Sequence, residues 1–193
     1  MNANLVSKVG EIGQDNLIAR LTPAAEAMGI KVASGSGKLS RGALLGRNAS
    51  GKYVPYGVIT TEDQKFSGDG TEKNFTVSAK PATLKSVKVG GTAKTEGTDF
   101  TYTAATGVIA FGTAPTAGTN NVVAEYDVCN AGDLEVSCIL ADDVDATSAD
   151  ATGVAYRCGN FNPAAVILPT GYTLTDADID ALRRFDIIFT QML

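Results

Sequence analysis

Few side chains in this sequence could do chemistry, and one type is missing. The 193 residues include no histidine. This excludes the most frequent general base, the most frequent zinc ligand and every Ser-His or Cys-His nucleophile pair. The three cysteines, Cys129, Cys138 and Cys158, form no Cys-x-x-Cys pair. Such an odd, scattered set indicates buried free thiols in a reducing compartment, not a disulfide framework or a zinc ribbon.

A glycine-rich segment imitates a phosphate-binding loop. Residues 35–38 read Gly-Ser-Gly-Lys, and a Walker loop also contains Gly-Lys. That loop requires an earlier glycine and a hydroxyl residue after the lysine, because its amides and its hydroxyl hold phosphate and magnesium. Val32 and Leu39 occupy these two positions. We therefore predict an ordinary hairpin turn between two strands.

Four aspartates form an acidic cluster in the second half of the chain: Asp142, Asp143, Asp145 and Asp150. A calcium loop of the EF-hand type needs a central glycine and a terminal glutamate, and residues 141–150 contain neither. We interpret the cluster as a solvated loop that caps backbone groups or meets another subunit. No catalytic residue, metal site or cofactor site is predicted, and we expect a protein that is not an enzyme.

Charge is unevenly distributed along the chain. The net charge is −5, yet residues 1–60 hold seven basic and three acidic side chains, and residues 131–193 hold three basic and ten acidic ones. A negative net charge disfavours nucleic acid as a partner. The opposite charges of the two ends of the chain could orient contacts between subunits. No apolar run approaches the length of a membrane helix, so we expect no membrane partner.

Composition predicts a separate unit at residues 62–127. This segment has twelve threonines, one leucine (Leu84), and neither arginine nor cysteine. Short alternating stretches at 74–78, 84–89, 99–103, 107–111 and 121–127 are separated by turn residues. This pattern is typical of a small antiparallel β-sandwich inserted into another domain.

The flanks of this insertion also predict strands, with one helix near the end. The expected strands cover 30–33, 39–45, 52–54, 57–60, 134–139, 153–156 and 164–168. A helix should begin after Thr175, because Ile179, Leu182 and Phe185 then share one face. The fold class is therefore mainly β with one short C-terminal helix, and residues 187–189 form an apolar closing segment.

Residues 1–28 look like an arm that needs a partner. Its apolar side chains are separated by Gly, Asn and Ser, which makes a poor helix. We interpret the segment as one that adds a strand to another chain. The alternative is an N-terminal strand that packs on its own domain. The apolar residues concerned are Leu5, Val6, Val9, Ile12, Leu17 and Ile18.

Several stretches resemble the head decoration, or capsid cement, proteins of lambda-type tailed phages. Residues 31–47 read KVASGSGKLSRGALLGR, and residues 51–56 read GKYVPY. Residues 139–146 (ILADDVDA), 160–165 (NFNPAA) and the end of the chain at 181–189 are similar to the C-terminal half of that family. The resemblance covers roughly residues 17–60 and 134–193, and the order and spacing of the stretches carry it.

This resemblance implies a small mixed β-barrel-like decoration domain, formed by residues 29–61 and 128–193. It also implies a homotrimer that binds the major capsid protein at three-fold positions on the outer surface of the virion and stabilises the head. The arm, residues 1–28, would make the capsid contact. The insertion at 62–127 departs from simple members and resembles immunoglobulin-like sandwiches. As an alternative function, this sandwich would attach the particle to a host cell-surface polymer.

Overall fold

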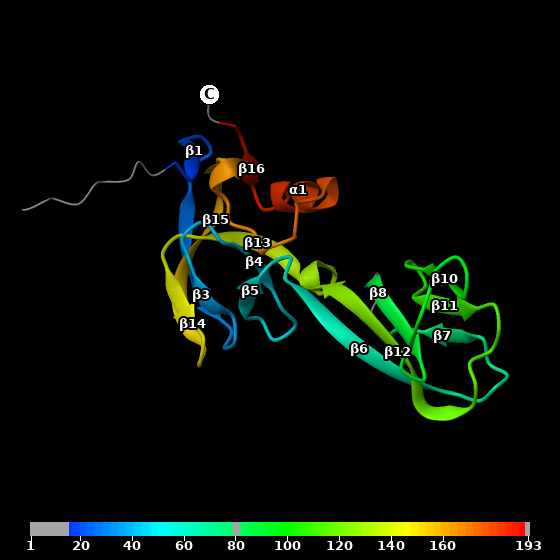
Figure 1. Cartoon of the computed structure of the whole chain (residues 1–193). Helices are drawn as coiled ribbons and strands as arrows, with labels where there is room; N and C mark the ends of the chain where they lie inside the picture. Colours follow the sequence, from blue (N-terminus) through cyan, green and yellow to red (C-terminus); the bar gives the residue numbers. More distant parts are fainter. Residues whose placement is uncertain (1–15, 79–81, 192–193) are drawn as a thin grey trace, which may run out of the picture. The chain divides into compact units, whose positions relative to one another are not determined.

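Strands dominate the computed structural model of the chain, which describes residues 16–78 and 82–191 (Figure 1). About 52% of the chain is strand and 9% is helical, which confirms the mainly β prediction. The chain divides into two compact units. The first unit comprises the residues up to Leu45, Ser137–Ile167 and the residues from Asp176 on, and the second unit comprises Gly46–Val136 and Leu168–Thr175.

The first unit contains most of the elements near the two ends of the chain. Its elements are β1 (Ile18–Arg20), β2 (Glu26–Val32), β3 (Gly37–Leu39), β14 (Val144–Ala146), β15 (Ala151–Phe161), a 3-10 turn (Pro163–Ala165), α1 (Asp176–Arg183) and β16 (Ile187–Phe189). Strands β4 (Leu44–Arg47) and β13 (Glu135–Leu140) carry the chain across the boundaries between the units. Five strands of the chain close into a mixed barrel.

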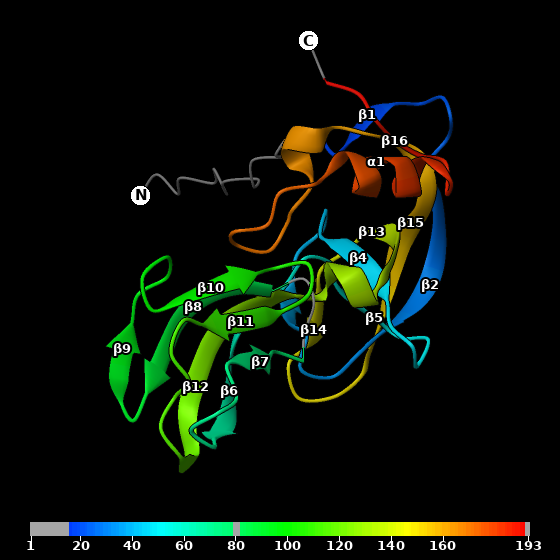
Figure 2. The ribbon, with the colours of Figure 1, turned by 90° about the vertical axis from the view of Figure 1, so that its right-hand side faces the viewer.

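Strand β15 organises the first unit, because it pairs with more strands than any other described there. It is antiparallel to β1, β2 and β13, and parallel to β16. Figure 2 shows β2 running beside β15. At its end, Phe161 is fully buried and lies opposite both Ile18 and Phe189. Strands from the beginning and the end of the chain therefore meet at one residue.

The predicted hairpin at residues 35–38 is wrong. The chain does turn there, with Gly35 at φ 84° and Gly37 at φ 76°. However, β2 pairs with β15, and β3 pairs with β14 through the register Val144↔Leu39. The glycines turn the chain away from β2, so a distant strand becomes the partner of β3.

The predicted strand at 39–45 is two strands separated by Gly42. This glycine has a φ of 94°, and a Cβ atom there would lie 2.8 Å from the carbonyl oxygen of Ala165. Its N–H donates to the carbonyl of Leu140 at 2.8 Å. Because only glycine fits this close approach at positive φ, the chain breaks between β3 and β4.

Two predictions for the C-terminal region need correction. The predicted strand at 164–168 is a 3-10 turn over Pro163–Ala165, and the side chain of Asn162 caps it by accepting the N–H of Ala164 at 3.1 Å. The predicted helix is confirmed as α1, with Leu182 buried. Phe185 lies beyond the end of α1 and is 37% exposed, so it does not belong to the apolar face of the helix.

The second unit contains the elements from β5 to the 3-10 turn that follows β12. These are β5 (Tyr53–Pro55), β6 (Ile59–Gly68), β7 (Asn74–Thr76), β8 (Ala82–Val89), β9 (Thr92–Lys94), β10 (Phe100–Thr103), β11 (Val108–Phe111), β12 (Gly118–Cys129) and a 3-10 turn (Asn130–Asp133). Two antiparallel sheets form here, with strand orders β6-β12-β8-β9 and β10-β11-β7. We call these two sheets the sandwich; Figures 1 and 2 show them as separate layers.

The sandwich has one continuous core between its two sheets. Alternate residues of the facing strands point inward, as period-2 geometry requires. The buried members are Phe75, Val77, Val87, Phe100, Ile109, Phe111, Val122, Ala124 and Tyr126. Phe111 packs edge-on against Phe75 and tilted against Phe100, with ring centroids 5.8 Å apart in both pairs. The predicted antiparallel sandwich is therefore confirmed.

The sandwich begins and ends in one long antiparallel ladder. Strands β6 and β12 pair from Ile59↔Cys129 to Gly68↔Gly118. At the first end, Asn130 accepts the N–H groups of Gly57 and Val58, each at 2.9 Å. The expected boundaries at residues 62 and 127 fall inside this ladder, and the second unit extends further in both directions.

Candidate binding surfaces

The predicted arm residues fall into two groups. Leu5, Val6, Val9 and Ile12 lie outside the described residues. Leu17 is 3% exposed, and its carbonyl accepts the N–H of Asn162 at 2.9 Å. Ile18 is the first residue of β1 and pairs with β15. Leu17 therefore packs within its own chain and is not available to a partner, which corrects its assignment to a capsid-binding arm.

Within the part of the chain that the structure describes, strand β1 lies at the edge of its sheet. It pairs with β15 and stands at the end of the strand order. Directly after it, Leu21 is 86% exposed, the largest exposure among the large apolar side chains that the structure describes. An edge strand presents backbone N–H and C=O groups that another strand can use. The edge of β1 and the side chain of Leu21 together form a candidate contact surface.

The acidic cluster caps loops of the first unit. Asp143 accepts the backbone N–H of Arg41 at 2.8 Å, and Asp150 accepts that of Ser34 at 3.0 Å. Asp145 accepts both the N–H and the hydroxyl of Thr147. Three of the four aspartates thus have the capping role that the sequence indicated. Within residues 16–78 and 82–191, no three His, Cys, Asp or Glu side chains are grouped as metal ligands would be.

Arg41 connects the loops around this cluster, a role that sequence reasoning missed. Its guanidinium donates to the carbonyl of Ala141 and to the hydroxyl of Tyr156. The same guanidinium lies 5.5 Å from the centre of the Tyr156 ring. Arginine stacks on aromatic rings in this way while its planar donors bind oxygen. Arg41 therefore holds three distant parts of the first unit together.

The cysteines differ in exposure. Cys138 is fully buried, whereas Cys129 and Cys158 are partly exposed, and all are free thiols. Burial raises the pKa of the Cys138 thiol to about 12. Because the thiolate is the reactive form, Cys138 stays protonated and unreactive while the first unit is folded.

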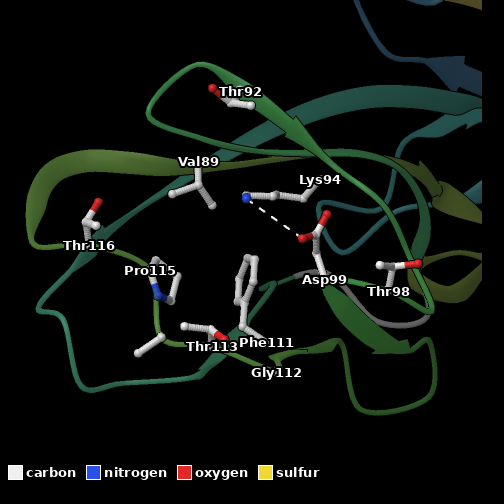
Figure 3. Close-up of a pocket in the computed structure, with 11 residues that line it drawn as sticks. Val89, Thr92, Lys94, Thr98, Asp99, Phe111, Gly112, Thr113, Pro115 and Thr116 are labelled. Atoms are coloured by element: carbon white, nitrogen blue, oxygen red, sulfur yellow. Dashed lines mark ion pairs between the residues drawn. The ribbon is translucent and has the colours of Figure 1, made fainter.

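A pocket of about 370 Å³ opens at one end of the sandwich (Figure 3). Strands β8 and β9 of one sheet and the end of β11 in the other contribute to it, together with the loops that follow β9 and β11. The lining residues are Val89, Thr92, Lys94, Thr98, Asp99, Phe111, Gly112, Thr113, Ala114, Pro115 and Thr116. Its wall is therefore a mixture of hydroxyl groups, one charge pair and apolar side chains.

The charge pair of the pocket consists of Lys94 and Asp99, which point toward one another (Figure 3). The Lys94 Nζ atom lies 3.8 Å from Asp99 Oδ1. The other oxygen, Asp99 Oδ2, accepts the backbone N–H of Thr95 at 2.8 Å. This backbone bond fixes the carboxylate at the pocket wall. No sequence motif signals the pocket, because turns bring together residues from 89–99 and 111–116.

Among the described residues, no helix is long and apolar enough to cross a membrane. Comparison with known proteins finds no counterpart: no protein-family model, no curated protein and no solved structure matches the chain.

Proposed function

We propose that the chain is a capsid decoration protein of a tailed phage. It binds as a trimer at three-fold positions on the outer face of the shell made by the major capsid protein, and it stabilises the head. The stretches that resemble lambda-type decoration proteins suggest this role. In it the protein is a structural component of the virion and not an enzyme.

One observation carries the proposal: two of the resembling stretches, distant in sequence, contact each other residue by residue. The N–H of Gly35 donates to the carbonyl of Ala146 at 2.9 Å, and the N–H of Arg41 donates to Asp143 at 2.8 Å. Strands β3 and β14 pair between the same stretches. Chance matches to a family pattern have no reason to meet in space, so these contacts support a shared structural origin.

The edge of β1 supplies a means of attachment. Leu17 is buried in the first unit and fixes the start of β1 there. The exposed Leu21 follows at the other end of β1. A strand from the capsid protein that paired there would gain backbone hydrogen bonds and bury this leucine.

Trimer formation would make such small contacts effective. Strand β1 has only three residues, and a single copy of so short an edge binds weakly. Once one arm of a trimer is bound, the other two meet their sites at a high effective concentration. Avidity can therefore convert three modest contacts into stable decoration.

The test combines the purified full-length protein with undecorated, expanded shells of the phage that encodes it. We expect a trimer by sedimentation velocity, saturable co-sedimentation with the shells, and added density at three-fold positions by electron cryomicroscopy. Decorated shells should also resist heating better than bare ones. A monomeric protein that leaves the shells bare would contradict the proposal.

Two variants locate the attachment surface. Leu21→Asp should weaken shell binding at least tenfold, because each buried leucine side chain contributes about 1.5–3 kcal/mol. Deletion of residues 1–15 should also reduce binding and leave the trimer intact. Thr101→Asp, on an exposed position of β10, is the matched control and should bind normally. Equal binding by Leu21→Asp and the control would remove the β1 edge from the proposal.

A further inference from the structure

We infer that the pocket at the end of the sandwich binds a neutral saccharide unit, a pyranose that presents neighbouring hydroxyl groups. Its volume of about 370 Å³ lies within the roughly 300–1,000 Å³ of small-molecule sites. The pocket is lined only by residues of the second unit. The inference is therefore independent of the trimer and of attachment to a capsid.

The spacing of Lys94 and Asp99 leaves both groups able to bind a ligand. Their 3.8 Å separation exceeds the roughly 2.7–3.2 Å of an N–H···O hydrogen bond. The amine can donate three hydrogen bonds, and the carboxylate only accepts them. A hydroxyl group both donates and accepts, so two neighbouring hydroxyls can accept from Lys94 and donate to Asp99. Charge-assisted hydrogen bonds of this kind are the stronger ones.

The loop before β10 holds the carboxylate in place. Asp99 Oδ2 accepts the N–H of Thr95 at 2.8 Å, and the backbone carbonyl of Asp99 accepts the N–H of Gly112 at 2.9 Å. The N–H of Gly97 also donates to the carbonyl of Phe100 at 2.8 Å. A polar group fixed before the ligand arrives requires less ordering upon binding.

The pocket also offers a small apolar contact for the C–H groups of a sugar ring. Val89, Phe111 and Pro115 lie around the space beside the Lys94 amine (Figure 3). Phe111 is 5% exposed and packs against Phe75 and Phe100 in the core, and Pro115 is buried. These side chains therefore expose little area to the pocket, and the hydroxyl groups of the sugar make most of the contacts.

Charge balance favours a neutral ligand. The charges of Lys94 and Asp99 cancel. An anion drawn to the amine would be repelled by the carboxylate, and a cation drawn to the carboxylate would be repelled by the amine. Lys73 does not line the pocket, and its amine donates to the carbonyl of Gly112 at 2.9 Å. The lining also contains four threonines, whose hydroxyls are uncharged: Thr92, Thr98, Thr113 and Thr116. Such a wall suits a ligand rich in hydroxyl groups.

This site gives a ligand class to the alternative function expected from the sequence, attachment to a host cell-surface polymer. A single open pocket binds one sugar weakly. A polysaccharide repeats the same unit, so many copies of the chain displayed on one particle would sum weak single sites to firm attachment. Only this last step rests on the proposed decoration function.

Titration of the isotopically labelled full-length protein tests the inference. The probes are glucose, galactose, mannose, rhamnose and N-acetylglucosamine, and backbone amide shifts are recorded by NMR. At least one sugar should cause saturable shifts that are confined to residues 92–99 and 111–116. Lys94→Met should weaken its binding about tenfold or more, because a hydrogen bond to a charged group is lost.

Matched variants separate the site from general effects. Asp99→Asn retains an oxygen that can accept the Thr95 N–H, so it should preserve the loop and still weaken binding. Lys88→Met changes an exposed lysine of β8 that does not line the pocket, and it should bind the sugar as the original protein does.

Three results would overturn the inference. In the first, none of the five sugars shifts any amide at millimolar concentration. In the second, a sugar binds, but Lys94→Met and Asp99→Asn bind it as tightly as Lys88→Met. In the third, sulfate or ammonium shifts the same amides at lower concentration than every sugar, which would indicate a site for an ion. None of these measurements involves shells, so failure here and failure of the decoration proposal are distinguishable.

Discussion

The sandwich and the first unit are both built from strands, but their strands find partners in different ways. In the sandwich, β8 pairs with β9 and β10 with β11, which are neighbours in sequence, and the longer β6–β12 ladder closes the same continuous segment. In the first unit, β15 pairs with β1 and β2 from one end of the chain and with β16 from the other. The sandwich is assembled from one continuous segment, and the first unit requires both ends of the chain.

The two cores also differ in composition. Aromatic rings join the sheets of the sandwich, where Phe66, Phe75, Phe100 and Phe111 form successive contacts. The first unit is packed mainly with aliphatic and small side chains around Phe161, and two of its buried polar atoms, Ser137 Oγ and Asn160 Oδ1, have no partner among the described residues. A local aromatic core explains how a large insertion can fold within another domain.

The largest expected effects come from truncating one residue in each core. Phe161→Ala should lower the free energy of unfolding of the first unit by about 3–5 kcal/mol, and Ile109→Ala should lower that of the sandwich by about 2–5 kcal/mol. Both residues are fully buried. Hydrogen–deuterium exchange, resolved by peptide, measures the opening of each region separately.

Each of these variants is the control for the other. If the regions fold as separate units, Phe161→Ala leaves exchange in β10 and β11 unchanged, and Ile109→Ala leaves β15 unchanged. If both variants accelerated exchange equally in all strands, the chain would unfold as one cooperative unit, and the two regions would not be independent.

The rate at which Cys138 reacts with a thiol reagent tests the same difference between the two regions. In a protein carrying Cys129→Ser and Cys158→Ser, a thiol reagent should modify the native state very slowly, because Cys138 is buried and its pKa is raised to about 12. Phe161→Ala should accelerate modification by about a hundredfold or more, since each 1.4 kcal/mol is a factor of about ten. Ile109→Ala should leave the rate unchanged, and acceleration by that variant would contradict the prediction.

Acid should weaken both regions through particular carboxylates. In the sandwich, hydrogen bonds lower the pKa of two aspartates below the usual value. The main donor to Asp69 is the N–H of Glu72, and the main donor to Asp127 is the hydroxyl of Thr61. In the first unit, chiefly the Thr147 hydroxyl lowers the pKa of Asp145.

The sign follows from linkage between protonation and folding. A carboxylate whose folded pKa is depressed stabilises the protein above its unfolded pKa, and this contribution disappears as the pH falls through the folded value. Stability of both regions should therefore fall as the pH drops below about 4. Asp127→Asn should flatten the acid dependence of the sandwich alone, and Asp145→Asn that of the first unit alone. Unfolding by urea at stepwise lower pH measures both slopes.

The smallest effect is expected at Ser137. Its hydroxyl oxygen is buried without a partner among the described residues, and such a group costs stability. Ser137→Ala should therefore raise the free energy of unfolding of the first unit by up to about 1 kcal/mol. A loss larger than 1 kcal/mol would show that the hydroxyl makes a hydrogen bond that stabilises the fold.

Sequence patterns predict the strands of the sandwich well because alternation is a local signal. Alternation within each short strand fixes which side chains face the core, and some of the turns connect strands that pair directly, such as β8 with β9 and β10 with β11. The pairs Phe100↔Phe111 and Tyr102↔Ile109 follow from two adjacent stretches joined by one turn. The helix start after Thr175 is predictable for the same reason, since caps and dipoles act within a single turn.

The remaining features depend on distant partners, and sequence patterns carry little of that information. The break at Gly42 is imposed by the carbonyl of Ala165, which lies far along the chain. The sequence around Leu17 predicts a free arm. Its burial cannot be predicted locally, because it depends on packing with elements near the other end of the chain. The pocket was missed because Lys94, Asp99 and Phe111 become neighbours only after two sheets have packed.

The ladder of β6 and β12 has a consequence for engineering. Because Ile59 and Cys129 are paired, the two chain ends at this end of the ladder are only about 5 Å apart, and Asn130 fixes the chain beside them. Residues 60–128, which include the whole core of the sandwich, should therefore be replaceable by a foreign epitope or enzyme whose own termini are adjacent. The protein becomes a scaffold for displaying cargo.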